Sequence, residues 1–81
     1  MRIKIFFFAT VREYVGAKTV EMEVPMQTTV AMLKKLLVKK YPQMASTQKS
    51  IIAAVNREYS ADEFLIPADA EIAFFPPVSG G

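Results

Sequence analysis

One segment with helical spacing, residues 30–41, most limits what this chain can fold into. Its apolar residues recur at intervals of three and four: Val30, Leu33, Leu37 and Tyr41. Thr28 or Thr29 can cap the first turn, and Pro25 and Pro42 interrupt regular structure on either side. The pattern therefore predicts one main helix, with shorter elements before and after it.

Four lysines occupy the rest of this helix: Lys34, Lys35, Lys39 and Lys40. We expect them to form a solvated face, because they have no aromatic neighbours on which bases could stack. The net charge of the chain is only +2, which gives little reason to expect nucleic acid as a partner.

The other segments have the short alternating or uniformly apolar patterns that are typical of β-strands. The expected strands are Arg2–Phe8, Lys18–Val24, Ile51–Val55, a brief strand at Tyr59, and Glu71–Phe75. The expected connections are Thr10–Val15, a polar loop at Gln43–Ser50, a turn at Asn56–Glu58 and an irregular segment at Ala61–Ile66. The first and last strands are apolar on both faces, as central strands are. We therefore predict an α+β fold of the β-grasp (ubiquitin-like) type, a mixed sheet packed on one main helix.

The chain has 81 residues, which is enough for one small domain, expected at residues 1–77. It contains no Cys and no His, so disulfides and thiolate metal sites are excluded, and the usual zinc ligand and general base are missing. We expect no bound metal or cofactor. The longest apolar stretches, Ile5–Ala9 and Ile72–Val78, are far shorter than a membrane span. A cytoplasmic protein with no membrane partner is the expectation.

The last residues form the most informative segment. Pro76 and Pro77 fix the backbone after the final strand and direct the chain away from the sheet. We expect Val78, Ser79, Gly80 and Gly81 to form a flexible tail whose glycines can enter a narrow channel in another protein. A carboxylate at Gly81 is a poor electrophile, so chemistry there needs a partner that adenylates it with ATP. A sulfur donor could then convert the adenylate to a thiocarboxylate, an anionic nucleophile.

Aromatic residues near this tail predict a docking surface. Strand alternation places Phe8 and Phe75 on the sheet face opposite the helix, with Tyr59 as a less certain neighbour. Exposed apolar patches of this kind usually mark interfaces. We therefore favour a partner surface over rings covered by the chain's own loops.

Residues 73–81, Ala-Phe-Phe-Pro-Pro-Val-Ser-Gly-Gly, closely resemble the end of the sulfur-carrier proteins of the MoaD/ThiS family, which includes the small subunit of molybdopterin synthase. The opening residues 3–16 and the segment Ala53–Asn56 resemble the same family. One departure is the last turn, where Ala68-Asp69-Ala70-Glu71 lacks the glycine that the family often has. Asp69 tolerates a positive φ better than most residues.

The resemblance implies adenylation by an E1-like (MoeB-like) enzyme and a thiocarboxylate at Gly81, with Gly80 as its slender neighbour. It also implies a MoaE-like large subunit, in a heterotetramer, that receives the tail. There the sulfur would pass to cyclic pyranopterin monophosphate to form molybdopterin. Phe8, Phe75 and Tyr59 would contact the partner, as would residues 76–79, and the catalytic pocket would belong to the large subunit.

Three alternatives stay open at this point. The chain could carry sulfur for another pathway, such as thiamine thiazole synthesis. It could be a ubiquitin-like modifier joined to lysines through Gly81. It could also be an interaction module whose tail is inert.

Overall fold

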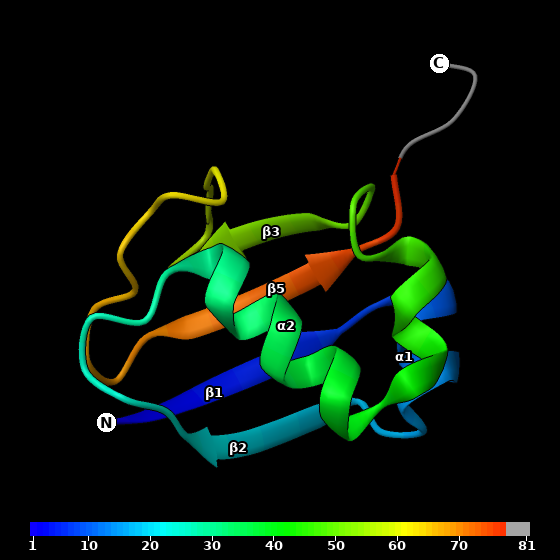
Figure 1. The fold of residues 1–81 in the computed structure, drawn as a ribbon, viewed down its shortest axis with the longest axis horizontal. Coiled ribbons are helices and arrows are strands. Elements are labelled where there is room, and N and C mark those ends of the chain that lie inside the picture. The colour runs from blue at the N-terminus through cyan, green and yellow to red at the C-terminus, as the bar shows by residue number, and fades with distance from the viewer. Residues whose placement is uncertain (78–81) are drawn as a thin grey trace.

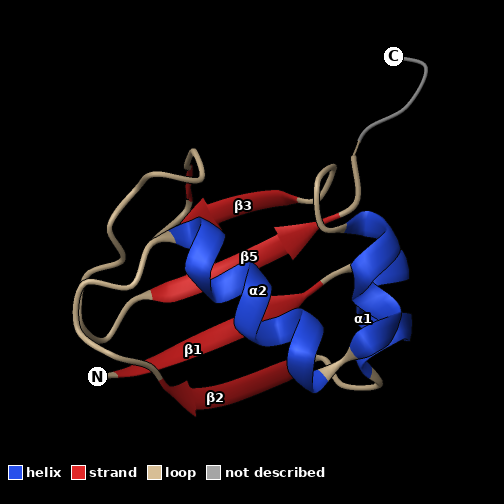
Figure 2. Ribbon diagram, in the orientation of Figure 1, coloured by secondary structure: helices blue, strands red, loops and turns tan. Residues whose placement is uncertain are grey.

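The computed structural model describes residues 1–77, which form a five-stranded mixed sheet with helices on one face (Figures 1 and 2). The strand order is β2-β1-β5-β3-β4. The strands are β1 (Arg2–Phe7), β2 (Thr19–Glu23), β3 (Ile52–Val55), β4 (Glu58–Tyr59) and β5 (Glu71–Phe75). The first and last strands are parallel neighbours inside the sheet, which confirms the predicted β-grasp arrangement.

Helix α2 (Val30–Lys40) lies across one face of the sheet and creates the core with it (Figure 2). Inward side chains alternate along the two central strands, where Ile3, Ile5 and Phe7 meet Ile72 and Phe74. Leu33 and Leu37 of α2 are buried in the same cluster, as their spacing predicted. The helix-facing half of the sheet therefore matches the expectation drawn from alternation and helical periodicity.

The beginning of α2 is held by the loop before β5. The Thr29 side chain accepts a hydrogen bond from the Met32 N–H, so Thr29 is the N-cap. The backbone carbonyls of Phe64 and Asp62 accept from the N–H groups of Val30 and Ala31 at 3.0 Å each. This loop therefore satisfies helix N–H groups that would otherwise lack partners.

Two predicted connections contain helices that local patterns did not indicate. Thr10–Val15 belongs to helix α1 (Ala9–Val15), which buries Val11 and ends at Gly16, a left-handed residue with φ 79°. Gln43–Ser50 contains the 3₁₀-helix η1 (Pro42–Thr47), whose Met44 is buried. Both helices are short. Val11, Tyr14 and Val15 of α1 have helical spacing, but over a single turn, and η1 contributes one fully buried side chain, so neither has the apolar repeat over several turns that predicts a helix.

The prediction that all four helix lysines are solvated is wrong for Lys34. Its side chain is 9% exposed, and its ammonium contacts the Asp62 carboxylate at 2.8 Å. It also donates to the Ile51 carbonyl at 3.3 Å. The long aliphatic stem crosses the edge of the core, and the charge is paired at its end. Lys35, Lys39 and Lys40 are exposed as predicted.

Candidate functional site: the open face of the sheet

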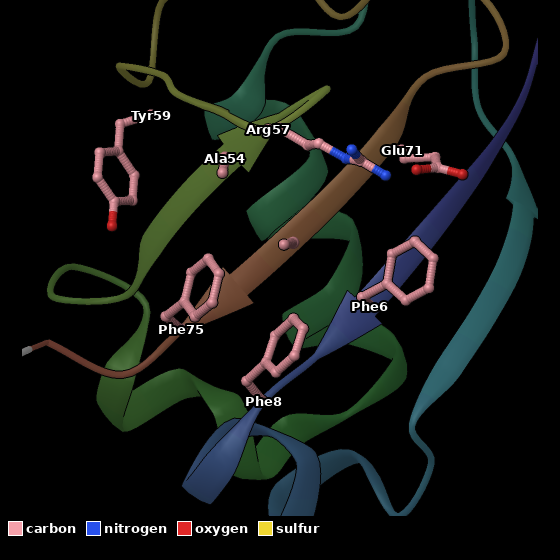
Figure 3. Close-up of a pocket in the computed structure, with 8 residues that line it drawn as sticks. Phe6, Phe8, Ala54, Arg57, Tyr59, Glu71 and Phe75 are labelled. Atoms are coloured by element: carbon pink, nitrogen blue, oxygen red, sulfur yellow. The ribbon is translucent and has the colours of Figure 1, made fainter.

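The sheet face opposite α2 carries two stacked aromatic rings. Phe8 follows β1 and Phe75 ends β5; their ring centroids are 4.8 Å apart and their planes are inclined by 11° (Figure 3). A backbone hydrogen bond from the Phe8 N–H to the Phe74 carbonyl holds the two strand ends together. Phe8 is 43% exposed although it is paired with another ring. The described part of the chain therefore leaves this pair open to contact.

The rings form one wall of a surface pocket of about 420 Å³. Its lining residues come from β1, β5, β3 and the hairpin that leads to β4: Phe6, Phe8, Ala54, Arg57, Tyr59, Glu71, Ala73 and Phe75 (Figure 3). The floor is made of small side chains, because Ala54 and Ala73 are paired across β3 and β5. Tyr59 is 82% exposed at the edge. Large rings around a floor of alanine produce a hollow that can accept an apolar side chain.

The turn between β3 and β4 places a charged group at the rim of this pocket. Val55 pairs with Glu58, so Asn56 and Arg57 form a two-residue hairpin loop with φ values of 49° and 73°. Positive φ at both positions is the type I′ geometry, for which glycine is favoured at the second position. Arginine there costs about 1–2 kcal/mol of backbone strain.

The opposite end of the open face is charged and paired. Lys4 lies across from Glu21, and Arg2 lies across from Glu23. The Arg2 guanidinium approaches Glu21 at 3.4 Å and Glu23 at 3.7 Å. The open face therefore changes from an ion-paired region beside β2 to an aromatic region at the end of β5.

The structure brings together Phe8, Phe75 and Tyr59, the three aromatic residues predicted for the site. Pro76 and Pro77 follow directly in the chain and are half-buried and exposed. The predicted residues Val78, Ser79, Gly80 and Gly81 lie outside the described residues, so the sulfur-bearing position and the tail stay predictions.

Sequence reasoning did not assign Phe6 and Arg57 to the site. Phe6 has the same parity as Phe8 on one strand, and that alternation could have added it to the patch. The sequence gives a weaker indication for Arg57, because the direction of the Arg57 side chain depends on the type of turn that begins at Asn56. In the last turn, which lacks a glycine, Asp69 adopts the positive φ that it was expected to tolerate, with a value of 59°.

Among residues 1–77, no group of three potential metal ligands comes together. None of the helices in this range is long and apolar enough to cross a membrane. The exposed rings and the apolar lining of the pocket make the open face suited to contact with another protein.

The comparisons identify the class of protein that carries this face. Residues 5–81 match the ThiS family, and the chain belongs to that family. It is 40% identical to the molybdopterin synthase sulfur carrier subunit of Dictyostelium discoideum, over 99% of this chain and 96% of that one.

Solved structures show the same fold. Small archaeal modifier protein 1 of Haloferax volcanii has a TM-score of 0.85 at 28% identity, covering 95% of this chain and 98% of that one. A chain from the Helicobacter pylori complex of subunits 1 and 2 of molybdopterin-converting factor has a TM-score of 0.69 at 15% identity, covering 100% of both chains. At that identity the second similarity concerns the fold alone.

Proposed function

We propose that this chain is the sulfur-carrier subunit of a molybdopterin synthase. The observation that carries the proposal is the position of the stacked Phe8–Phe75 pair. Phe75 is the last residue of β5, and the chain continues directly from it into Pro76, Pro77 and the final glycines. A docking surface at the root of the tail holds a partner where the tail can reach its interior. Membership of the ThiS family and the name of the Dictyostelium relative support the same function.

The proposed chemistry takes place at the carboxylate of Gly81. A carboxylate oxygen attacks the α-phosphate of ATP on an E1-like enzyme, and pyrophosphate leaves. A sulfur nucleophile then displaces AMP and leaves a thiocarboxylate. Ionised thiocarboxylate sulfur is a better nucleophile than the original carboxylate oxygen, for the reason that thiolates are more reactive than thiols. The thiocarboxylate sulfur attacks a carbon of cyclic pyranopterin monophosphate and displaces an oxygen substituent from it. Water then hydrolyses the resulting thioester, which releases the new thiol on the pterin and regenerates the carboxylate.

The proposed division of labour leaves the substrate pocket to the large subunit. The open face contributes the aromatic rings and the pocket, which are suited to docking. The name of the Dictyostelium relative, a sulfur carrier subunit of a synthase, supports a partner of this kind. Rings around a floor of alanine are suited to an apolar anchor on that partner.

Mass spectrometry tests the function directly. The chain is incubated with its E1-like enzyme, ATP and a sulfur donor, and its mass should increase by the difference between one sulfur and one oxygen. Adding the large subunit and the pterin substrate should return the mass to its original value and produce molybdopterin. A variant without Gly81 is the matched control, which should keep the fold and gain no sulfur. An unchanged mass of the intact chain with an active enzyme would contradict the proposal.

A second candidate is a ubiquitin-like protein modifier, favoured by the similarity to small archaeal modifier protein 1. It predicts covalent adducts in which Gly81 is joined to lysines of target proteins. Peptide mapping of lysates that contain the tagged chain would show remnants of its C-terminal peptide, ending in Gly81, on those lysines. Remnants that disappear when Gly81 is deleted, with no molybdopterin formed by the intact chain, would favour this alternative.

A further inference from the structure

The hairpin turn at residues 56–57 is fixed against the central strand. The Asn56 N–H donates to the Glu71 carbonyl at 2.8 Å, and the Asn56 side-chain oxygen accepts from the Glu71 N–H at 3.0 Å. This reciprocal pair binds the loop to β5 at a point beside the pocket. The backbone of Arg57 is therefore held in its left-handed conformation, with φ 73°. A strained conformation that the surroundings maintain is a reason to look for a function.

The side chain of Arg57 extends over the open face. Figure 3 shows it leaving the turn and pointing across the sheet toward Glu71, above the floor of the pocket. The ion pairs of residues 1–77 involve Arg2, Lys34 and the N-terminal amine, and Arg57 takes part in none of them. Lys4, the other cation near the pocket, lies 5.4 Å from the centre of the Phe6 ring. A guanidinium therefore stands at the rim of an apolar pocket, and none of the carboxylates of residues 1–77 lies within ion-pair distance of it.

A partner that covers this pocket removes water from Arg57. A desolvated guanidinium needs a hydrogen-bonded acid, and an interface that leaves it unpaired loses affinity. Planar carboxylates suit arginine because two parallel N–H groups can contact both oxygens. An arginine at the edge of an apolar pocket can thus select a partner and also reject one that lacks the acid.

We propose that Arg57 is a specificity-determining residue that pairs with a carboxylate of the large subunit, next to the apolar side chain that fills the pocket between Phe6, Phe8 and Phe75. This inference rests on the proposed function and adds the chemistry of the partner's surface to it. The recognised element is an apolar anchor with an Asp or Glu beside it. Glu71 lines the same pocket, and the ion pairs of residues 1–77 do not include one between Glu71 and Arg57.

The strain gives a test that separates binding from folding. Arg57→Gly removes the charge and suits the turn, so it should raise the Tm by about 4–8 °C for each kcal/mol of strain that it relieves. Arg57→Gln removes the charge and keeps a side chain of similar length, and Arg57→Lys keeps the charge. Calorimetry with the purified cognate large subunit at low salt should show affinity about tenfold weaker for Arg57→Gly and Arg57→Gln. Arg57→Lys should lie between these variants and the intact chain.

Salt dependence and a distant charge provide the controls. Most of the difference between the intact chain and Arg57→Gln should persist at high salt, because an ion pair from which the partner excludes water is screened much less than an exposed one. Lys39→Gln removes a cation from the exposed side of α2, and its affinity should equal that of the intact chain. An Arg57→Gln variant that binds as tightly as Lys39→Gln at low salt would overturn the inference alone. Failure of the intact chain to bind the large subunit would overturn the proposed function with it.

Discussion

Two pairs of phenylalanine rings, one residue apart in the chain, lie on opposite faces of the same two strands. Phe7 and Phe74 face α2, with ring centroids 6.3 Å apart, and are 1% and 0% exposed. Phe8 and Phe75 face the other way, with ring centroids 4.8 Å apart, on the side of the sheet away from α2 (Figure 3). Residue type, strand and neighbour are the same in both pairs, and only the covering layer differs.

The comparison shows how one sheet can carry a core and a docking site. Burying the inner pair under the helix contributes the hydrophobic free energy of two large side chains to folding. The outer pair keeps part of its apolar surface in water, where a second protein can remove it. Strand alternation separates the two roles, so a change in one pair should leave the other role largely intact.

The largest expected effect comes from breaking the inner pair. Phe74→Ala should lower the free energy of unfolding by about 3–5 kcal/mol, because it leaves a cavity in the core. Denaturant titration followed by circular dichroism measures the loss. Phe75→Ala is the matched control one residue away, and its loss should be about 1 kcal/mol because Phe75 is only half-buried.

A milder variant guards against complete unfolding. Phe74→Leu should cost about 1–2 kcal/mol and leave a cooperative transition that can be measured. Equal losses for Phe74→Ala and Phe75→Ala would contradict the separation of the two faces.

The next effect comes from breaking the outer pair. Phe8→Ala and Phe75→Ala should each weaken binding of the large subunit by about 30-fold or more, since buried aromatic anchors dominate interface free energies. Surface plasmon resonance with the immobilised large subunit measures the affinity. Met32→Ala is the control, because Met32 on α2 is 45% exposed, as Phe8 is 43% exposed on the other face. Loss of binding in Met32→Ala, with Phe8→Ala unaffected, would place the interface on the helix layer.

The smallest effect sharpens the comparison by using charges instead of rings. Asp62→Ala leaves the nearly buried Lys34 ammonium with the Ile51 carbonyl as its described partner, and should cost about 1–2 kcal/mol of stability. Arg2→Gln on the open face should cost less than about 0.5 kcal/mol, because the Arg2 side chain and its acid partners are more than half exposed. Urea titrations measure the free energy of unfolding of both variants. Equal losses would show that the contribution of an ion pair to stability does not depend on which face of the sheet carries it.

Alternation and periodicity predicted most of the fold because they report directly on burial. The parity of Ile3, Ile5 and Phe7 places them in the core, and it places Phe8 outside. Local patterns failed where a distant contact decides the outcome. Lys34 is buried because Asp62, 28 positions further along, reaches its ammonium, and no helical wheel contains that information.

The candidate site, like the fold, could be predicted from the sequence only in part. The side of the sheet on which Phe8 and Phe75 lie follows from parity, but their contact depends on the register that aligns β1 with β5. The position of Arg57 depends on the two hydrogen bonds between Asn56 and the Glu71 backbone, which join segments 15 residues apart. Tertiary contacts of this kind are not visible in a single sequence, and they are what turns separate aromatic residues into a pocket.

The place of β5 in the sheet has a consequence for how the molecule is made. β5 is synthesised last among the strands and yet lies between β1 and β3, so the sheet stays in two parts until residues 71–75 have left the ribosome. Loop closure over this distance must come late in folding. A polypeptide released prematurely lacks the central strand and remains a target for proteases. The topology therefore makes completion of the sheet depend on synthesis of the strand that leads into the tail.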